Sequence, residues 1–272
     1  MGWMRWPVEI LAGEFTMGSE HGDDEKPVCR VKLPAYAIAR VPITNAQYQL
    51  FVAASGQPAP KHWPDGRIPK GLESHPVVYV SWQDAIAYCA WLSQMTGKSI
   101  TLPSEAEWEK AVRGDKDARE YPWGDTFDRL RCNTNELGLG TTTPVGIFPD
   151  GASPYGVLDM SGNVGEWTRS VYKPYPYRPD DGREDMKDGA WRVLRGGSFN
   201  PNAGSARAAY RFNYFNPGDR NDNNGFRVVV VVRRSTPYLL SLKGGFVPSS
   251  PDSCTLWPGQ PVMAQRRVSA PP

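Results

Sequence analysis

The chain has 272 residues, and its charges nearly balance, with 31 Lys and Arg against 29 Asp and Glu for a formal net charge of +2. The basic residues are spread along the sequence, which argues against a nucleic-acid-binding protein. The combination of 10 Trp with 27 Gly and 26 Pro indicates a loop-rich globular domain that buries aromatic surface, and it argues against a disordered chain.

The cysteines and the apolar segments of the sequence indicate in which cellular compartment the protein is expected. The four cysteines (Cys29, Cys89, Cys132 and Cys254) are widely separated and form no C-x-x-C pair, which favours a reducing compartment such as the cytoplasm. No signal peptide is recognised, because residues 1–15 contain an Arg and a Pro but no continuous apolar run of signal-peptide length. Residues 228–232 are consecutive valines, which are too few to span a bilayer and predict a buried strand.

The first predicted elements are strands. Residues 8–17 partly alternate between apolar and polar side chains and end at Gly18-Ser19, which predicts a strand closing in a turn. Residues 28–39 predict a second strand run, in which Pro34 forces a break or an edge position.

Capping signals then predict three helices. Each begins at a Ser or Thr that stands three residues before a Gln, Asp or Glu, and each ends at a glycine. The starting pairs are Thr44 and Gln47, Ser81 and Asp84, and Ser104 and Glu107, and the terminating glycines are Gly56, Gly97 and Gly114. In the third helix, Trp108, Ala111 and Val112 form the expected buried face.

The second half of the chain predicts mostly irregular backbone. Residues 115–188 show no convincing helix, and Val193-Leu194 and residues 226–232 predict two strands that bracket an unusual segment. After Arg234 the composition changes to Pro, Ser and Gly. We therefore expect one domain over residues 1–234 and a C-terminal extension over residues 235–272.

The unusual segment, residues 194–228, is called the displayed segment below. It contains seven Asn, six aromatic residues and five Arg, and it holds no nucleophile, metal triad or phosphate-binding loop. Rigid rings and adaptable amides together suit a recognition surface. The rings expected to offer this surface are Phe199, Tyr210, Phe212, Tyr214 and Phe215. The alternative is that Asn, Gly and Asp build turns while the rings pack inward. The five arginines could bind an anionic ligand, but arginines in such loops more often brace carbonyls and carboxylates within the fold, and bracing is the favoured interpretation.

Several strings in a fixed order carry a family resemblance. They include GEFTMGS at Gly13, HPVVYVSWQDAIAYCAWL at His75, LPSEAEWEKAVRG at Leu102 and GVLDMSGNVGEW at Gly156, followed by RVLRGGSF and NNGFRV. Over about residues 7–232 the chain resembles the formylglycine-generating enzyme (sulfatase-modifying factor) family. The resemblance implies a variant of the C-type lectin fold, an α+β architecture of short strands, few helices and much irregular loop.

The resemblance also bears on catalysis. Oxidising members of that family carry two cysteines after the Gly-Gly-Ser string, which bind copper and perform the oxidation. The matching positions here are Ala203 and Ala208, and an alanine methyl can neither form a thiolate nor ligate copper. We therefore expect that this chain is not an enzyme of the formylglycine-generating kind.

A second resemblance concerns the displayed segment, which is similar to the variable region of diversity-generating retroelement proteins that use this fold. In those systems, mutation of template adenines turns Asn codons into codons for residues such as Tyr, Phe, Ser, Gly and Asp at surface positions. The positions expected to vary and to bind ligand are Asn200, Asn202, Gly204, Tyr210, Phe212, Asn213, Tyr214, Phe215, Asn216, Asp219 and Asn221.

Calcium is the one cofactor that the sequence suggests. Two carboxylates separated by a Gly-Asn turn can bring several oxygens to one centre, although turns with flanking acids are common. By the family resemblance, a structural Ca²⁺ would be ligated by Asp159, Glu166 and the carbonyls of Gly162 and Val164. A second family calcium site would fall around residues 133–139.

The leading hypothesis is a non-catalytic binding protein that presents the displayed segment to a protein or other macromolecular ligand. The alternatives are an enzyme of the same superfamily with non-cysteine chemistry, such as a sulfoxide synthase, and an accessory or regulatory module. Such synthases generally carry an additional histidine-rich, iron-binding helical module, whereas this chain has only three His. An enzyme should show one deep pocket with convergent polar groups, and a display protein should show a broad shallow face.

Overall fold

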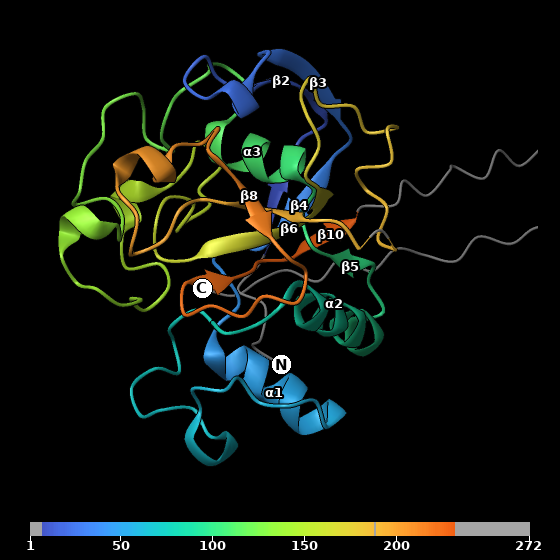
Figure 1. Cartoon of the computed structure of the whole chain (residues 1–272), viewed down its shortest axis with the longest axis vertical. Coiled ribbons are helices and arrows are strands. Elements are labelled where there is room, and N and C mark those ends of the chain that lie inside the picture. The colour runs from blue at the N-terminus through green and yellow to red at the C-terminus, as the bar shows by residue number, and fades with distance from the viewer. Residues whose placement is uncertain (1–6, 188, 232–272) are drawn as a thin grey trace, which may run out of the picture. The chain divides into compact units, whose positions relative to one another are not determined.

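A computed structural model describes residues 7–187 and 189–231, apart from the side chains of Asn213 and Tyr214. The described part is an α+β domain with three short-stranded sheets, three α-helices and much irregular loop (Figure 1). The predicted fold class is confirmed. The predicted C-terminal extension, residues 235–272, lies outside the described residues.

The first sheet joins the two ends of the described chain. Its strands, in spatial order, are β1 (Val8–Ile10), β4 (Tyr36–Ile38), β10 (Val229–Val231) and β5 (Ile100–Thr101), and all neighbours are antiparallel. The valine run therefore supplies an inner strand, as its apolar composition predicts. The prediction that this strand is buried is correct only at its start, because Val229 is fully buried whereas Val231 is 41% exposed.

The second sheet is a pair of antiparallel strands, β2 (Gly13–Met17) and β3 (Cys29–Leu33). The single strand predicted over residues 8–17 is thus two strands in different sheets, separated at Leu11-Ala12. Pro34 separates β3 from β4 as expected, because proline cannot donate a ladder hydrogen bond.

The third sheet carries the displayed segment. Its order is β8 (Arg211–Phe215), β7 (Arg192–Arg195), β6 (Gly165–Val171) and β9 (Asn224–Gly225), with β6 and β9 parallel and the other neighbours antiparallel. The sequence did not indicate β6. Its residues are buried on both faces, polar ones included, so the strand lacks the alternation by which a half-buried strand is recognised.

All three predicted helices are confirmed: α1 (Asn45–Ser55), α2 (Trp82–Thr96) and α3 (Glu105–Arg113). Each has the expected capping box and ends at the expected glycine. In Figure 1, α1 and α2 lie together on one side of β6 and β10, and α3 lies on the other side. Short 3₁₀ turns occupy the loops: η1 (Asp23–Glu25), η2 (Pro64–Gly66), η3 (Asn135–Leu137), η4 (Pro149–Gly151) and η5 (Ala203–Ala206).

The buried face of α3 is wider than predicted. Every residue of this helix is buried, including three glutamates, a lysine and an arginine. A helix that is charged yet buried all round needs partners for those charges in the surrounding elements.

Within residues 7–187 and 189–231, no helix combines the length and the apolarity that crossing a membrane requires.

An aromatic cluster fills the space between α1, α2 and the chain that leads into β10. We define it as Tyr48, Phe51, Trp63, Tyr88 and Phe226, all of which are at most 4% exposed. The Phe226 ring meets Tyr88 and Tyr48 edge to face, with centroids 5.3 and 6.3 Å apart. Phe226 therefore anchors the C-terminal end of the displayed segment in the core.

Candidate ligand-binding face

The displayed segment leaves β7, passes through η5, β8 and β9, and returns toward β10. Gly196 and Gly197 make the turn after β7, with φ angles of 95° and 71°. A Cβ on Gly197 would lie 2.9 Å from the carbonyl oxygen of Ser205. Only glycine combines this backbone conformation with so close an approach, so the turn folds the segment back against η5.

All five arginines of the displayed segment pair with carboxylates from other parts of the chain. The Arg211 guanidinium contacts Glu105 at 2.5 and 3.0 Å. The other pairs are Arg195 with Glu109, Arg207 with Glu25, Arg220 with Asp84 and Arg227 with Glu166. The interpretation that these arginines brace the fold is confirmed, and their charges are largely neutralised within the fold.

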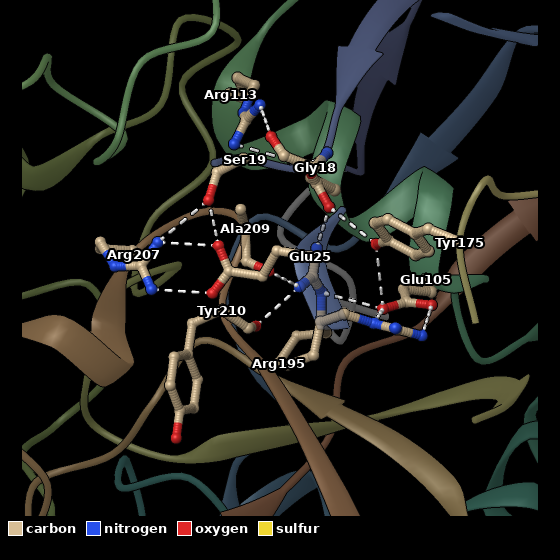
Figure 2. A network of polar contacts seen from close by, with 12 residues as sticks. Gly18, Ser19, Glu25, Glu105, Arg113, Tyr175, Arg195, Arg207, Ala209 and Tyr210 are labelled. Carbon is tan, nitrogen blue, oxygen red and sulfur yellow. Dashed lines mark hydrogen bonds and ion pairs between the residues drawn. The ribbon is translucent and has the colours of Figure 1, made fainter. Parts of the chain in front are cut away.

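Four of these side chains form a buried ionic cluster between α3 and the third sheet: Glu105, Glu109, Arg195 and Arg211. Each is at most 3% exposed, and Figure 2 shows Glu105 and Arg195 within the network. The Tyr175 hydroxyl lies 3.3 Å from Glu105 Oε1. Burial alone would raise the pKa of Glu105, but the charges of Arg211 and Arg195 hold it below its usual value. Because desolvation offsets much of the attraction in such clusters, we expect this one to fix geometry more than it adds stability.

The rings of the displayed segment divide into buried and half-buried ones. Phe199 is only 7% exposed, so the prediction that it offers surface is wrong. Tyr210, Phe212 and Phe215 are half-buried and meet edge to face in a row, with centroids 4.8 and 6.1 Å apart. The buried Trp167 supports Phe215 at 6.2 Å. These rings are held in place by their neighbours and keep part of their area accessible.

A small hollow lies beside this row of rings. It has a volume of about 20 Å³ and is lined by Gly165, Leu194, Gly197, Ser198, Phe212, Phe215, Asn223 and Asn224. Asn223 Nδ2 donates to Ser198 Oγ at 3.2 Å. Asn224 is 2% exposed, and its Nδ2 has no hydrogen-bond partner among the described residues. A buried unpaired donor costs about 1–3 kcal/mol.

The predicted polar positions differ in exposure. Asn200, Asn202, Gly204 and Asn216 are exposed, whereas Asp219 and Asn221 are half-buried. Asp219 Oδ2 accepts a hydrogen bond from the Asn216 amide at 2.8 Å, so this carboxylate builds a turn. The side chains of Asn213 and Tyr214 lie outside the described part of the structure. The turn-building alternative therefore fits Asp219, and the exposed amides stay candidates for ligand contact.

The two alanines that the resemblance predicts at the family's cysteine positions lie in different surroundings. Ala208 is fully buried, and its amide donates to the Glu120 carbonyl at 2.6 Å. Ala203 is half-buried in η5, and its amide donates to Glu136 Oε1 at 2.7 Å. Both positions therefore have structural roles that depend on the backbone.

The described thiols are poor nucleophiles. Cys29, Cys89 and Cys132 are free, and burial raises the pKa of each. For Cys132 the pKa rises to about 12. A thiol with a raised pKa is protonated at neutral pH and reacts slowly.

Glu166, a predicted calcium ligand, has both carboxylate oxygens bound to protein donors. Arg227 donates to Oε2 through Nε and to Oε1 through Nη2, each at 2.6 Å. Trp108 Nε1 also donates to Oε2, at 2.8 Å. A calcium ion at this buried carboxylate would have to displace a guanidinium cation, so the residues in this arrangement do not fit the ion.

The remaining predicted calcium ligands lie in the turn before β6. Asp159 Oδ2 accepts a hydrogen bond from the Gly146 amide at 2.7 Å, and burial raises the pKa of Asp159 to about 6. Among the described residues, no three His, Cys, Asp or Glu side chains are placed to share a metal ion. The site of Asp159, Gly162, Val164 and Glu166 stays a prediction, and the contacts of Glu166 count against it.

Sequence reasoning missed the carboxylates that hold the displayed segment. Glu105 and Glu109 stand four residues apart on α3, so their shared helical face was detectable. No sequence pattern indicated that this face is buried, because acidic residues on a helix usually face solvent. The position of Glu25 opposite Arg207 is a long-range contact that no local pattern indicates.

The fold and the face together define a class of protein: a C-type lectin-like scaffold in which a long segment between two sheets carries the candidate binding surface. The sulfatase-modifying factor enzyme 1-like domain matches residues 5–232, and the chain belongs to this family. The family resemblance seen in the sequence is confirmed.

Relatives with different names are equally similar to this chain. It is 34% identical to the formylglycine-generating enzyme of Streptomyces coelicolor, over 72% of this chain and 79% of that protein. It is also 34% identical to the inactive Cα-formylglycine-generating enzyme 2 of Mus musculus, over 81% of this chain and 84% of that protein. Overall identity therefore does not separate active from inactive members.

A longer relative is the serine/threonine-protein kinase Pkn1 of Chlamydia trachomatis. It is 35% identical over 81% of this chain, and this chain spans only 37% of the kinase. Among solved structures, PvdO from Pseudomonas aeruginosa superposes with a TM-score of 0.69 and 31% identity, over 82% of this chain and 92% of PvdO. Treponema denticola variable protein 1 also gives a TM-score of 0.69, with 24% identity over 82% and 94% of the two chains, and shares the fold.

Proposed function

We propose that this chain is a non-catalytic binding protein that presents the displayed segment to a protein or other macromolecular ligand. One observation carries the proposal. The arginines of the segment are paired within the fold, so its accessible groups include the row of Tyr210, Phe212 and Phe215 and the exposed amides beside it. Rigid rings bordered by amides resemble the anchors and polar neighbours of protein interfaces.

The unpaired amide in the hollow adds a specific feature to this surface. Asn224 lines this hollow beside the half-buried Phe212 and Phe215 rings, and its buried Nδ2 has no hydrogen-bond partner among the described residues. The hollow has room for about one water-sized group, which suits a contact point within a larger face.

The non-catalytic part of the proposal rests on the missing cysteines. Alanine occupies positions 203 and 208, and the three described thiols have raised pKa values. The existence of a relative named as inactive supports such a role in this family. When the chain is incubated with Cu(I) and a cysteine-containing sulfatase peptide, we expect no aldehyde to form on the peptide cysteine. Formation of an aldehyde on that peptide would overturn the assignment.

The diversification part of the proposal rests on the seven asparagines of the displayed segment and on the shared fold of Treponema denticola variable protein 1. Sequencing the locus tests it. We expect a near-identical template repeat whose adenines match the variable codons, with a reverse transcriptase gene nearby. Absence of both would remove diversification and leave a fixed binding surface.

An accessory or regulatory module is the second candidate. The kinase relatives favour it, because the matched region accounts for only 37% of Pkn1, a protein named as a kinase. In that case the displayed segment would bind one constant partner. A single sequence of residues 194–228 across isolates would favour this candidate over diversification.

The binding proposal is tested by selecting ligands for the full chain from a displayed peptide library and measuring their Kd. Phe212→Ser and Phe215→Ser should each weaken binding at least 10-fold, because each removes an anchoring ring, and tenfold in Kd is about 1.4 kcal/mol. Trp191→Ser is the matched control, since Trp191 is 50% exposed and lies outside the displayed segment. Equal effects of all three substitutions would contradict the proposal.

A further inference from the structure

The short stretch that carries Tyr210, residues 207–211, is held at every residue by groups outside it. The contacts are Arg207 with Glu25, Ala208 with Glu120, Ala209 and Tyr210 with Arg195, and Arg211 with Glu105. Two of them are ion pairs of side chains, and three are hydrogen bonds of the backbone. A stretch held in this way is ordered before a ligand arrives, which lowers the entropy cost of binding.

One loop far away in the sequence holds both ends of this stretch. It comprises residues 18–25 and is called the bracing loop below. The Glu25 carboxylate accepts two hydrogen bonds from the Arg207 guanidinium, at 2.8 Å from Nη2 and 2.9 Å from Nη1. The Asp24 carbonyl accepts a hydrogen bond from Arg211 Nη1 at 2.8 Å. The bracing loop therefore binds the guanidinium at each end of the stretch.

The bracing loop is closed on itself and attached to α3. The Ser19 amide donates to the Glu25 carbonyl at 3.1 Å, and the Ser19 hydroxyl donates to the Glu25 carboxylate. The Gly18 amide donates to Glu109 Oε1 at 2.7 Å. The Gly18 carbonyl accepts a hydrogen bond from Arg113 Nη1 at 2.8 Å (Figure 2). The Glu25 carboxylate is therefore presented from a fixed backbone.

This carboxylate is buried and ionised. Glu25 is only 1% exposed. Burial alone would raise its pKa, but the hydrogen bonds from Arg207 and Ser19 and the positive charge of Arg207 hold the pKa below its usual value. In a buried pair of this kind each charge depends on the other. Removing the charge of Glu25 would therefore release Arg207 from its place.

Arg207 links the bracing loop to the Tyr210 ring. Its carbonyl accepts the Tyr210 amide at 3.1 Å, and its guanidinium carbon lies 5.9 Å from the centre of the Tyr210 ring. This distance is within the roughly 6 Å of a cation–π contact. In Figure 2 the Tyr210 ring points away from Glu25, and Phe212 meets this ring edge to face at 4.8 Å. Arg207 therefore holds the backbone of Tyr210 and contacts the first ring of the row.

We infer that Glu25 is a positioning residue of the candidate ligand-binding face and acts through Arg207 on the Tyr210 ring. The inference rests on the proposed function, because it assigns a determinant of affinity to a loop outside the displayed segment. Glu25→Gln removes the charge and one of the two acceptor oxygens, so the guanidinium loses its bidentate partner. The Tyr210 ring then takes more than one orientation, and a ligand has to order it on binding.

Fluorine NMR of the full chain tests the positioning without any ligand. 3-Fluorotyrosine is introduced at position 210, and its signal in the parent chain is the reference. Glu25→Gln should shift or broaden this signal, because the ring loses its single orientation. Glu107→Gln is the matched control, since Glu107 is 7% exposed and forms a comparable bidentate pair, but with Arg169. An unchanged signal in folded Glu25→Gln, or the same change in the control, would overturn the inference.

A conservative variant separates positioning from a general loss of structure. Glu25→Asp keeps the charge but shortens the side chain, so it should disturb the fluorine signal less than Glu25→Gln does. It takes the place of Glu25→Gln if that variant does not fold, and an unchanged signal in it then counts against the inference.

A double-mutant cycle tests the consequence for binding. The probe is a peptide that is selected on the parent chain from a displayed library and whose binding Tyr210→Ser weakens. Glu25→Gln should weaken its binding about 3- to 10-fold, which is the cost of ordering one side chain. In the Tyr210→Ser background the same substitution should change the Kd less than about 2-fold, because the ring that Glu25 positions is gone. Equal effects in both backgrounds would show that Glu25 does not act through Tyr210. If no peptide can be selected, the proposed function fails, and the fluorine signal alone decides the inference.

Discussion

Two anchors of the displayed segment, Phe226 near its C-terminal end and the pair Arg195 and Arg211 nearer its start, use opposite kinds of chemistry. Near the C-terminal end, the Phe226 ring packs in the aromatic cluster between α1 and α2, and the neighbouring Arg227 pairs with Glu166. Nearer its start, Arg195 and Arg211 enter the ionic cluster beneath α3. Apolar packing is non-directional and tolerates a change of shape at similar volume, whereas a buried ion pair requires both partners. The aromatic anchor, Phe226, should therefore supply stability, and the ionic cluster should set the position of the face.

The largest expected effect comes from breaking the ionic cluster. Glu105→Ala leaves Arg211 buried without its main partner, which should lower the free energy of unfolding by about 3–5 kcal/mol. Urea denaturation monitored by circular dichroism measures it. The matched control is Asp84→Ala, which breaks the partly exposed pair with Arg220 and should cost about 0–1 kcal/mol. Similar small costs for both variants would mean that the ionic cluster is not an anchor.

A smaller effect is expected at the aromatic anchor. Phe226→Leu keeps an apolar side chain of similar volume, so it should cost less than about 1.5 kcal/mol even though the residue is fully buried. The same urea experiment gives the value. Met95→Leu, at a 67% exposed position on α2, is the control and should stay within about 0.5 kcal/mol of the parent chain. A cost for Phe226→Leu equal to that of Glu105→Ala would erase the contrast between the two anchors.

Acid should weaken the ionic cluster selectively. The pKa of Glu105 is lowered in the folded chain, because Arg211 and Arg195 outweigh the opposing effect of burial. Its stabilising contribution is therefore complete above the pKa of an unfolded glutamate, about 4.3, and is lost as the pH falls through the folded value. The unfolding free energies of the parent chain and of Glu105→Gln should differ by a constant amount near neutral pH. This difference should shrink below about pH 4. A difference that grows on acidification would refute this assignment.

The smallest expected effect concerns calcium. Because Arg227 already holds both oxygens of Glu166, the change in Tm on adding calcium should be the same in the parent chain and in Glu166→Gln. Differential scanning fluorimetry of chelator-treated protein, with magnesium as the control ion, measures it. A bound ion adds about 2.7 kcal/mol of stability when its free concentration is 100 times its Kd. A calcium-specific rise in Tm that Glu166→Gln abolishes would restore the site predicted from the sequence and require Arg227 to move away.

Local signals in the sequence were sufficient for the helices. Capping boxes and terminating glycines depend on neighbouring residues only, and all three helices begin and end where these residues stand. The strands were partly predictable. The break at Pro34 follows from proline's missing donor, but β6 escaped because a strand buried on both faces has no alternation to detect.

The displayed segment shows the limit of the same reasoning. Its composition predicted accessible rings, and Tyr210, Phe212 and Phe215 are partly accessible, whereas Phe199 is buried. Nothing local distinguishes these four rings. Their exposure depends on which neighbours the third sheet brings against them, such as Trp167 under Phe215.

The amino-acid sequence by itself determined the family, the helices and the absence of cysteine at positions 203 and 208, because each depends on the identity or the spacing of nearby residues. The tertiary structure alone decided which carboxylate meets which arginine and which ring stays accessible. These features join residues about a hundred positions apart, such as Arg211 and Glu105. Such pairings arise from the packing of the whole domain, which no local pattern encodes.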